Sequence, residues 1–384
     1  MSEKVQVSGE YSSRFAALAT AFADSFRDHG DTGAALSLYY RGELQLDIWA
    51  GKRDKKDVDD WQADTRVNVF SAGKALVAVS LLQQMELAGL SLDTPVKEIW
   101  PEFQNSQVNV RQVLCHRSGF SAFQKKVPDE VIYDWRRVTE QLAGETPWWE
   151  PNQAQGYSPM LFGWLGGELC RRLAGAARFN DVVQKTISQP LGISAGFGLS
   201  EEEQQTLADV RALDSRYVPK DAAKLMTIFK DEPGGVTQKA FTNPMSIMVG
   251  TNSQAWRQAQ IPGGNACTNA RSLATFYQAL LEPGKLLGEA FTTALRQQQS
   301  YSECDNVLKT SLGFGLGFML SDERDELRLG SAQNSFGHPG AGGCVGFADP
   351  NTDIAFAYTT RDMGQSLLLD PRAIRLIDAA YACL

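Results

Sequence analysis

Ser71 and Lys74, three residues apart, are the strongest candidates for chemistry in this 384-residue chain. Residues 75–88 are apolar on nearly every face, which predicts a buried helix that ends at Gly89. Ser71 would then lie at the helix start, where free N–H groups favour negative charge, with Lys74 one turn later on the same face. A buried lysine whose amine is partly neutral could take the proton of the serine hydroxyl.

The same pair also has a simpler explanation. A Ser-x-x-Lys spacing arises by chance about once in a chain of this length. Ser71 could be only a helix cap, and Lys74 only a surface lysine with a partly covered stem. The apolar character of the helix and two later stretches favour the catalytic interpretation.

The overall composition narrows the classes of function. A net charge of −8 argues against nucleic acid or an anionic membrane as a partner. No apolar run reaches the ~18–20 residues that a bilayer span needs, and the N-terminus has no hydrophobic signal region. The six cysteines show no C-x-x-C spacing, so we expect free thiols and a cytoplasmic location. With three histidines and no His–Cys cluster, we expect no metal site.

Strand patterns lie at both ends of the chain and helix patterns in its middle. Hydrophobic spacing predicts helices over 12–29, 159–173, 270–282 and 371–383. Alternating residues predict a hairpin over 34–50 and further strands over 313–320, 326–329, 343–348 and 354–360.

We therefore predict an α+β fold in which both chain ends build one antiparallel sheet, flanked by the terminal helices. Residues 1–80 and 270–384 would form this α/β domain. Residues 81–269 would form a mainly helical second domain, and the active site would lie at the junction, where ligand sites tend to fall.

Tyr157 stands just before the predicted helix that Pro159 opens. A tyrosine at such a loop tip can share a proton with a nearby serine and lysine, and we expect Lys74 to favour the phenolate. Taken alone, an ordinary turn tyrosine is the simpler explanation.

A glycine-dense run from Phe336 to Gly343 contains His338, Gly340 and Ala341. Such a run lets the backbone approach a ligand and present its N–H groups. Acyl transfer needs two donors aimed at the developing oxyanion, and the N–H groups of Ser71 and Ala341 are the candidates. Otherwise the run is a glycine-rich turn with a surface histidine.

These three stretches together resemble the serine β-lactamase-like superfamily, which includes class C β-lactamases, penicillin-binding DD-peptidases and family VIII carboxylesterases. Ser71 and Lys74 match its Ser-x-x-Lys motif, Tyr157-Ser158 matches the start of Tyr-x-Asn, and His338-Pro339-Gly340 stands in place of Lys-Thr-Gly. Residues 114–120, Leu-Cys-His-Arg-Ser-Gly-Phe, look like its "LLxHxSG" segment, which makes His116 a structural residue. The resemblance runs through nearly the whole chain in the family's order.

This chain departs from the family motifs at two positions, and these positions indicate which members of the superfamily it resembles most. Pro159 replaces the asparagine of Tyr-x-Asn, whose amide is expected to hold a β-lactam side chain. His338 replaces the lysine of Lys-Thr-Gly, which weakens the grip on a substrate carboxylate. The resemblance is therefore closest to the family VIII carboxylesterases.

The resemblance implies hydrolysis of short-chain esters through an acyl-enzyme on Ser71, with Lys74 and Tyr157 as a coupled base and without cofactor or metal. The oxyanion donors would be Ser71 and Ala341. His338, Gly340, Trp148 and Trp149 would shape the pocket for a small-molecule ester. The alternatives are a β-lactamase or D-amino-acid peptidase, an acyltransferase, and a catalytically silent binding protein on the same fold. The sequence does not set the oligomeric state.

Overall fold

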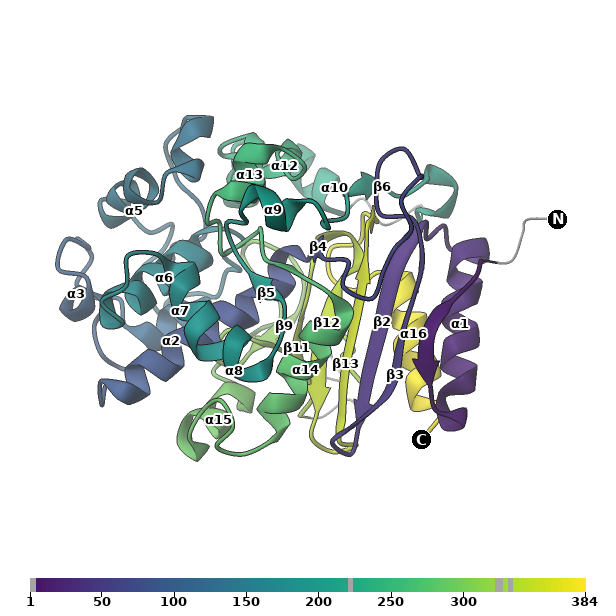
Figure 1. The fold of residues 1–384 in the computed structure, drawn as a ribbon. Coiled ribbons are helices and arrows are strands. Elements are labelled where there is room, and N and C mark those ends of the chain that lie inside the picture. The colour runs from purple at the N-terminus through teal and green to yellow at the C-terminus, as the bar shows by residue number, and fades with distance from the viewer. Residues whose placement is uncertain (1–4, 220–223, 322–326, 331–333) are drawn as a thin grey trace.

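The computed structural model describes residues 5–219, 224–321, 327–330 and 334–384. Within them, strands from both chain ends form one antiparallel sheet (Figure 1). Its strands, in spatial order, are β1 (Ser8–Tyr11), β3 (Glu43–Gly51), β2 (Gly33–Tyr40), β13 (Ile354–Thr360), β12 (Val345–Asp349), β11 (Phe336–Pro339), β10 (Met319–Leu320), β9 (Leu312–Phe314) and β8 (Ser300–Ser302). The helices used below are α1 (Ala16–Asp28), α2 (Lys74–Leu87), α6 (Leu161–Leu173), α14 (Ala270–Leu281) and α16 (Pro371–Tyr381).

The two faces of the sheet carry side chains of different size. On β13, Ile354, Phe356 and Tyr358 belong to the core that includes α1 and α16, whereas Ala355 and Ala357 belong to the core that includes α14. Successive side chains of a strand point to opposite faces, so this alternation places the terminal helices on one face and α14 on the other. Figure 1 shows α1 and α16 together on their side of the sheet. The predicted sheet and its terminal helices are confirmed.

Two strand predictions need correction. Residues 313–320 do not form one strand, because Gly317 adopts φ +78° and the chain turns between β9 and β10. Leu327–Leu329 are described without strand structure, and position 326 of that predicted strand lies outside the described residues. Strand β11 was not predicted, because Gly337 and Pro339 are poor strand formers.

Helix α2 is buried on every side from Lys74 to Leu82, as its composition predicts, and only its last turn reaches the surface. It packs against α6, where Gly166 lies so close that an added Cβ would come 2.8 Å from Val77 Cγ1. It also contacts β11, and so lies between the sheet and the helical middle of the chain. The predicted domain boundaries at residues 80 and 270 stay a prediction.

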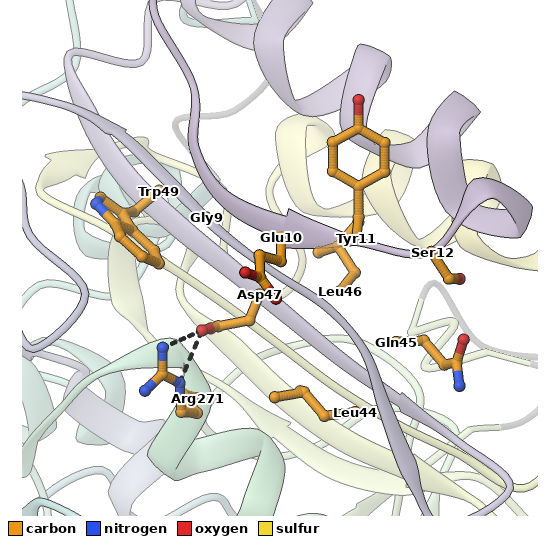
Figure 2. Close-up of a pocket in the computed structure, with 10 residues that line it drawn as sticks. All are labelled: Gly9, Glu10, Tyr11, Ser12, Leu44, Gln45, Leu46, Asp47, Trp49 and Arg271. Carbon is orange, nitrogen blue, oxygen red and sulfur yellow. Dashed lines mark hydrogen bonds and ion pairs between the residues drawn. The ribbon is translucent and has the colours of Figure 1, made fainter.

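An open groove of about 650 Å³ runs along the sheet edge at β1 and β3 (Figure 2). Across it, Arg271 from α14 forms an ion pair with Asp47 of β3. The groove includes Ser12, but no base pairs with that hydroxyl among its lining residues. It therefore lacks the arrangement that nucleophilic catalysis needs, despite its size.

No helix in the described part of the chain is long and apolar enough to cross a bilayer.

Candidate active site

Ser71 lies in a single 3₁₀ turn, Phe70–Gly73, that leads directly into α2. The α-helix itself begins at Lys74, so Ser71 lies in the turn before the helix and not at the helix start where the sequence predicted it. Phe70 adopts φ +50°, a left-handed conformation that costs about 1–3 kcal/mol in a bulky residue and that clusters at functional sites. The turn is anchored by Val69 N–H, which donates to Ala266 O at 2.8 Å. Ser71 is half-buried, whereas its two polar partners are fully buried behind it.

Lys74 Nζ lies 2.9 Å from Ser71 Oγ. The same nitrogen donates to Pro159 O at 2.6 Å and to Gly263 O at 2.8 Å. Burial lowers the pKa of Lys74 well below its usual value, because the charged amine loses its hydration. A neutral amine has two N–H groups and one lone pair. With both N–H groups on the carbonyls, the lone pair is left for the hydroxyl of Ser71.

Tyr157 completes the group, because its hydroxyl donates to Ser71 Oγ at 2.8 Å. Its backbone N–H donates to the buried carboxylate of Asp305 at 3.0 Å. The next residue, Ser158, donates its N–H to His116 Nδ1 at 3.0 Å. His116 lies against the Tyr157 ring, with 5.0 Å between ring centroids. Asp305 and His116 therefore hold the loop that presents the tyrosine to Ser71.

The expectation that Lys74 favours a phenolate at Tyr157 is wrong for this geometry. Burial raises the pKa of Tyr157 above its usual value, and this effect outweighs the hydrogen bond to Ser71, which lowers it. A neutral Lys74 also offers no positive charge to stabilise a phenolate. Tyr157 is therefore a phenol that donates its proton toward Ser71.

Ser71 and Tyr157 open into a cavity of about 430 Å³ that also includes His338, Gly340 and Ala341. His338 is buried, and its Nδ1 lies 2.7 Å from Pro339 O, a pure acceptor, so Nδ1 carries the proton. Burial lowers the pKa of His338 to about 3, because the charged ring would lose its hydration. The ring is therefore neutral at pH 7. The predicted oxyanion donors, the N–H groups of Ser71 and Ala341, belong to two residues that line this cavity.

Trp148 and Trp149 do not line this cavity, contrary to their predicted place in the pocket. Trp148 Nε1 donates to Ala122 O at 2.8 Å, and Trp149 Nε1 donates to Ala154 O at 3.1 Å. The Trp149 ring packs so closely under Gly156 that an added Cβ there would come 2.3 Å from it. Both indoles support the loop before Tyr157, because their apolar rings join the adjacent core.

Asp305 and the apolar lining of the cavity were not anticipated from the sequence. Asp305 stands in Cys304-Asp305-Asn306, which matches no catalytic spacing, and it reaches Tyr157 across 148 residues of chain. The carbonyl of Gly263 belongs to a turn, Pro262 to Asn265, whose glycines gave the only local signal of a close backbone approach.

We expect Gly340→Ala to destabilise the fold by about 1–3 kcal/mol and to lower activity, because the new Cβ would come 2.2 Å from Val69 O and push β11 away from the Ser71 turn. Urea unfolding and ester hydrolysis measure the two effects. Gly144→Ala is the matched control, since its Cβ would meet nothing closer than 3.7 Å. Equal stability of the two variants would contradict this close approach.

The fold and this serine–lysine–tyrosine geometry define a hydrolase of the serine β-lactamase superfamily. The sequence profile of the beta-lactamase family matches residues 17–379, and the chain belongs to that family.

Individual relatives span almost the whole chain. The esterase/beta-lactamase LipL of Mycobacterium tuberculosis is 27% identical over 383 residues, which cover 96% of this chain and 86% of LipL. The crystal structure of a penicillin-binding protein homologue from Caulobacter crescentus is 30% identical, with a TM-score of 0.88, over 99% of this chain and 100% of that one. The crystal structure of a family VIII carboxylesterase is 28% identical, with a TM-score of 0.86, over the same shares of the two chains.

Proposed function

We propose that this hydrolase is a carboxylesterase that cleaves short-chain esters through an acyl-enzyme on Ser71. The observation that carries the proposal is the position of Ser71 Oγ, 2.9 Å from Lys74 Nζ and 2.8 Å from the Tyr157 hydroxyl. The names of two similar proteins, an esterase/beta-lactamase and a family VIII carboxylesterase, support the ester as the substrate.

Lys74 acts as the base in the first step. Its lone pair takes the proton of Ser71 while Oγ forms a bond to the ester carbonyl carbon, and the carbonyl oxygen becomes an oxyanion. The N–H groups of Ser71 and Ala341 stabilise this oxyanion.

Tyr157 acts as the acid in the second step. As the C–O bond breaks, its phenol gives a proton to the leaving alcohol, and the ammonium of Lys74 then returns a proton to the phenolate, so that both residues end neutral. Water then attacks the acyl-enzyme, and the same two residues act in the reverse sense. Tyr157 accepts a proton from the water and passes its own to Lys74, and Lys74 returns a proton to Ser71 Oγ as the carboxylic acid leaves.

β-Lactam hydrolysis is the second candidate, because the name of LipL includes both activities. Two features of the cavity favour the ester. His338 is neutral and so offers no cation to a substrate carboxylate, and Pro159 has no side-chain amide to hold a β-lactam side chain.

The deciding experiment compares p-nitrophenyl butyrate with nitrocefin as substrates of the same enzyme preparation. We expect the kcat/KM for the ester to exceed that for nitrocefin by about 100-fold or more, since the lactam carboxylate finds no cation. Faster nitrocefin turnover would assign the chain to the β-lactamase branch. Inactivity toward both compounds would favour a binding protein on this fold.

We expect Tyr157→Phe to lower kcat for p-nitrophenyl butyrate by about 10²-fold, because a general acid and a hydrogen bond to Ser71 are lost together. Tyr133→Phe, in the helical region, is the matched control, since Tyr133 does not line the cavity. In this variant kcat should fall more for an alkyl ester than for the p-nitrophenyl ester, because the alcohol of the alkyl ester is a poorer leaving group and depends more on protonation. Equal losses for the two esters would contradict the acid role.

The activity should rise with pH through the pKa of Lys74. Burial lowers that pKa, and only the deprotonated amine can accept the serine proton, so activity is lost as pH falls below it. A kcat/KM profile for p-nitrophenyl butyrate over the whole pH range in which the enzyme stays folded measures this limb. A profile that falls with rising pH over this range would contradict a lysine base.

A further inference from the structure

The cavity in front of Ser71 is walled mainly by apolar side chains from segments that are far apart in the sequence. Five of the eight methionines of the chain contribute to it, which is a strong concentration of one residue type. They are Met160, Met226, Met248, Met319 and Met363. The other large apolar side chains in the wall include Phe241, Ile247, Leu308, Leu367 and Leu368.

None of the lining residues in the described part of the chain carries a charge at pH 7. The one titratable ring besides Tyr157 is that of His338, which burial keeps neutral. A substrate carboxylate or ammonium inside this cavity would lose its hydration without gaining an ionic partner, which is costly. An uncharged apolar group loses little and gains contact with the wall.

The size and the rim of the cavity favour apolar acyl chains that are longer than butyryl. Its volume of about 430 Å³ lies within the range of pockets that bind drug-sized ligands, and a butyryl group fills only a small part of such a pocket. At the mouth, Met226 and Met248 are 49% and 45% exposed, so the apolar wall continues outward to solvent. Methionine is flexible and polarisable, and it adapts to chains of different shape.

We infer that the preferred substrates of this site are uncharged esters with a medium-length apolar acyl chain, which lies along the methionine-lined wall from Ser71 to Met226 and Met248. This inference rests on the proposed esterase function, but it places the preferred acyl chain above the short chains that the proposal names. Each methylene that moves from water to the wall improves binding about fourfold, so chain length should be visible in kcat/KM.

The test measures kcat/KM for p-nitrophenyl butyrate and p-nitrophenyl octanoate, both below the concentration at which the octanoate aggregates. We expect kcat/KM for the octanoate to exceed that for the butyrate by at least about tenfold. Full burial of the extra methylenes would give a still larger ratio. A second pair tests charge. The mono-p-nitrophenyl ester of glutaric acid should be at least about 50-fold worse than p-nitrophenyl pentanoate, because its carboxylate has no cation to meet.

Met226→Lys tests the location of the acyl chain. Met226 is half exposed, so a lysine there can reach solvent, and the fold should tolerate it. We expect the octanoate-to-butyrate ratio to fall at least about threefold and the glutarate-to-pentanoate ratio to rise by a similar factor. Leu87→Lys is the matched control, because Leu87 is 80% exposed at the end of α2 and does not line the cavity.

Equal kcat/KM values for butyrate and octanoate, or ratios that Met226→Lys leaves unchanged, would overturn this inference. The proposed function fails by a different result, which is ester hydrolysis that survives the loss of the Ser71 hydroxyl. An enzyme that needs Ser71 but shows no chain-length preference would thus keep the esterase assignment and refute only the acyl-chain site.

Discussion

Ser71→Ala is expected to lower kcat/KM for p-nitrophenyl butyrate by about 10⁴-fold or more, the largest effect of any single change in this chain. Both Lys74 Nζ and the Tyr157 hydroxyl lie within hydrogen-bond distance of Ser71 Oγ. Its removal takes away the nucleophile, whereas the oxyanion donors and the cavity remain and leave only a small residual rate. The measurement is steady-state ester hydrolysis with the purified variant.

Ser80→Ala is the control for that loss. Ser80 lies on the same buried helix α2, and its hydroxyl has no hydrogen-bond partner among the residues that the structure describes. Its removal should therefore leave stability and activity close to those of the wild type, since an unsatisfied buried hydroxyl contributes nothing favourable. Ester hydrolysis that persists in Ser71→Ala, or that disappears equally in Ser80→Ala, would contradict the assignment of Ser71.

Lys74→Met is expected to lower kcat/KM for the ester by about 10³-fold, because the general base disappears while the length of the side chain is kept. Methionine introduces no buried charge, although Pro159 O and Gly263 O lose their donor. Circular dichroism and thermal unfolding show whether the variant is folded. The residual activity of a folded variant should also lose the rise with pH that Lys74 produces.

Lys97→Met is the matched control, because Lys97 is an exposed lysine on a short surface helix, Val96–Ile99. It should retain wild-type turnover. A folded Lys74→Met enzyme with wild-type kcat and an unchanged pH profile would show that another group takes the serine proton.

The parts of this site that the sequence predicted are those whose arrangement is local. Ser71 and Lys74 are one helical turn apart, so their proximity follows from the buried helix that their neighbours form. The shared sheet followed from strand patterns at both chain ends, because alternating apolar residues must cover a core. The resemblance to a known superfamily then predicted that Tyr157 and Ala341 lie in the same site.

The remaining features depend on contacts between distant segments. Asp305 could not be foreseen, because only folding brings it to the backbone of Tyr157. Trp148 and Trp149 were misplaced, since an aromatic pair in a proline-flanked loop fits a pocket wall and a buried loop support equally well. The phenolate was wrongly expected because the sequence indicates a nearby lysine but not the depth of burial that raises the pKa of Tyr157.

The most direct test of Ser71 as the nucleophile is covalent labelling of the folded protein with a fluorophosphonate, followed by mass spectrometry of its peptides. We expect one adduct per chain on Ser71, formed in parallel with the loss of esterase activity and absent from Ser71→Ala. An adduct on a different serine that accompanies inactivation, or an unlabelled Ser71 in a protein that hydrolyses esters, would contradict this role of Ser71.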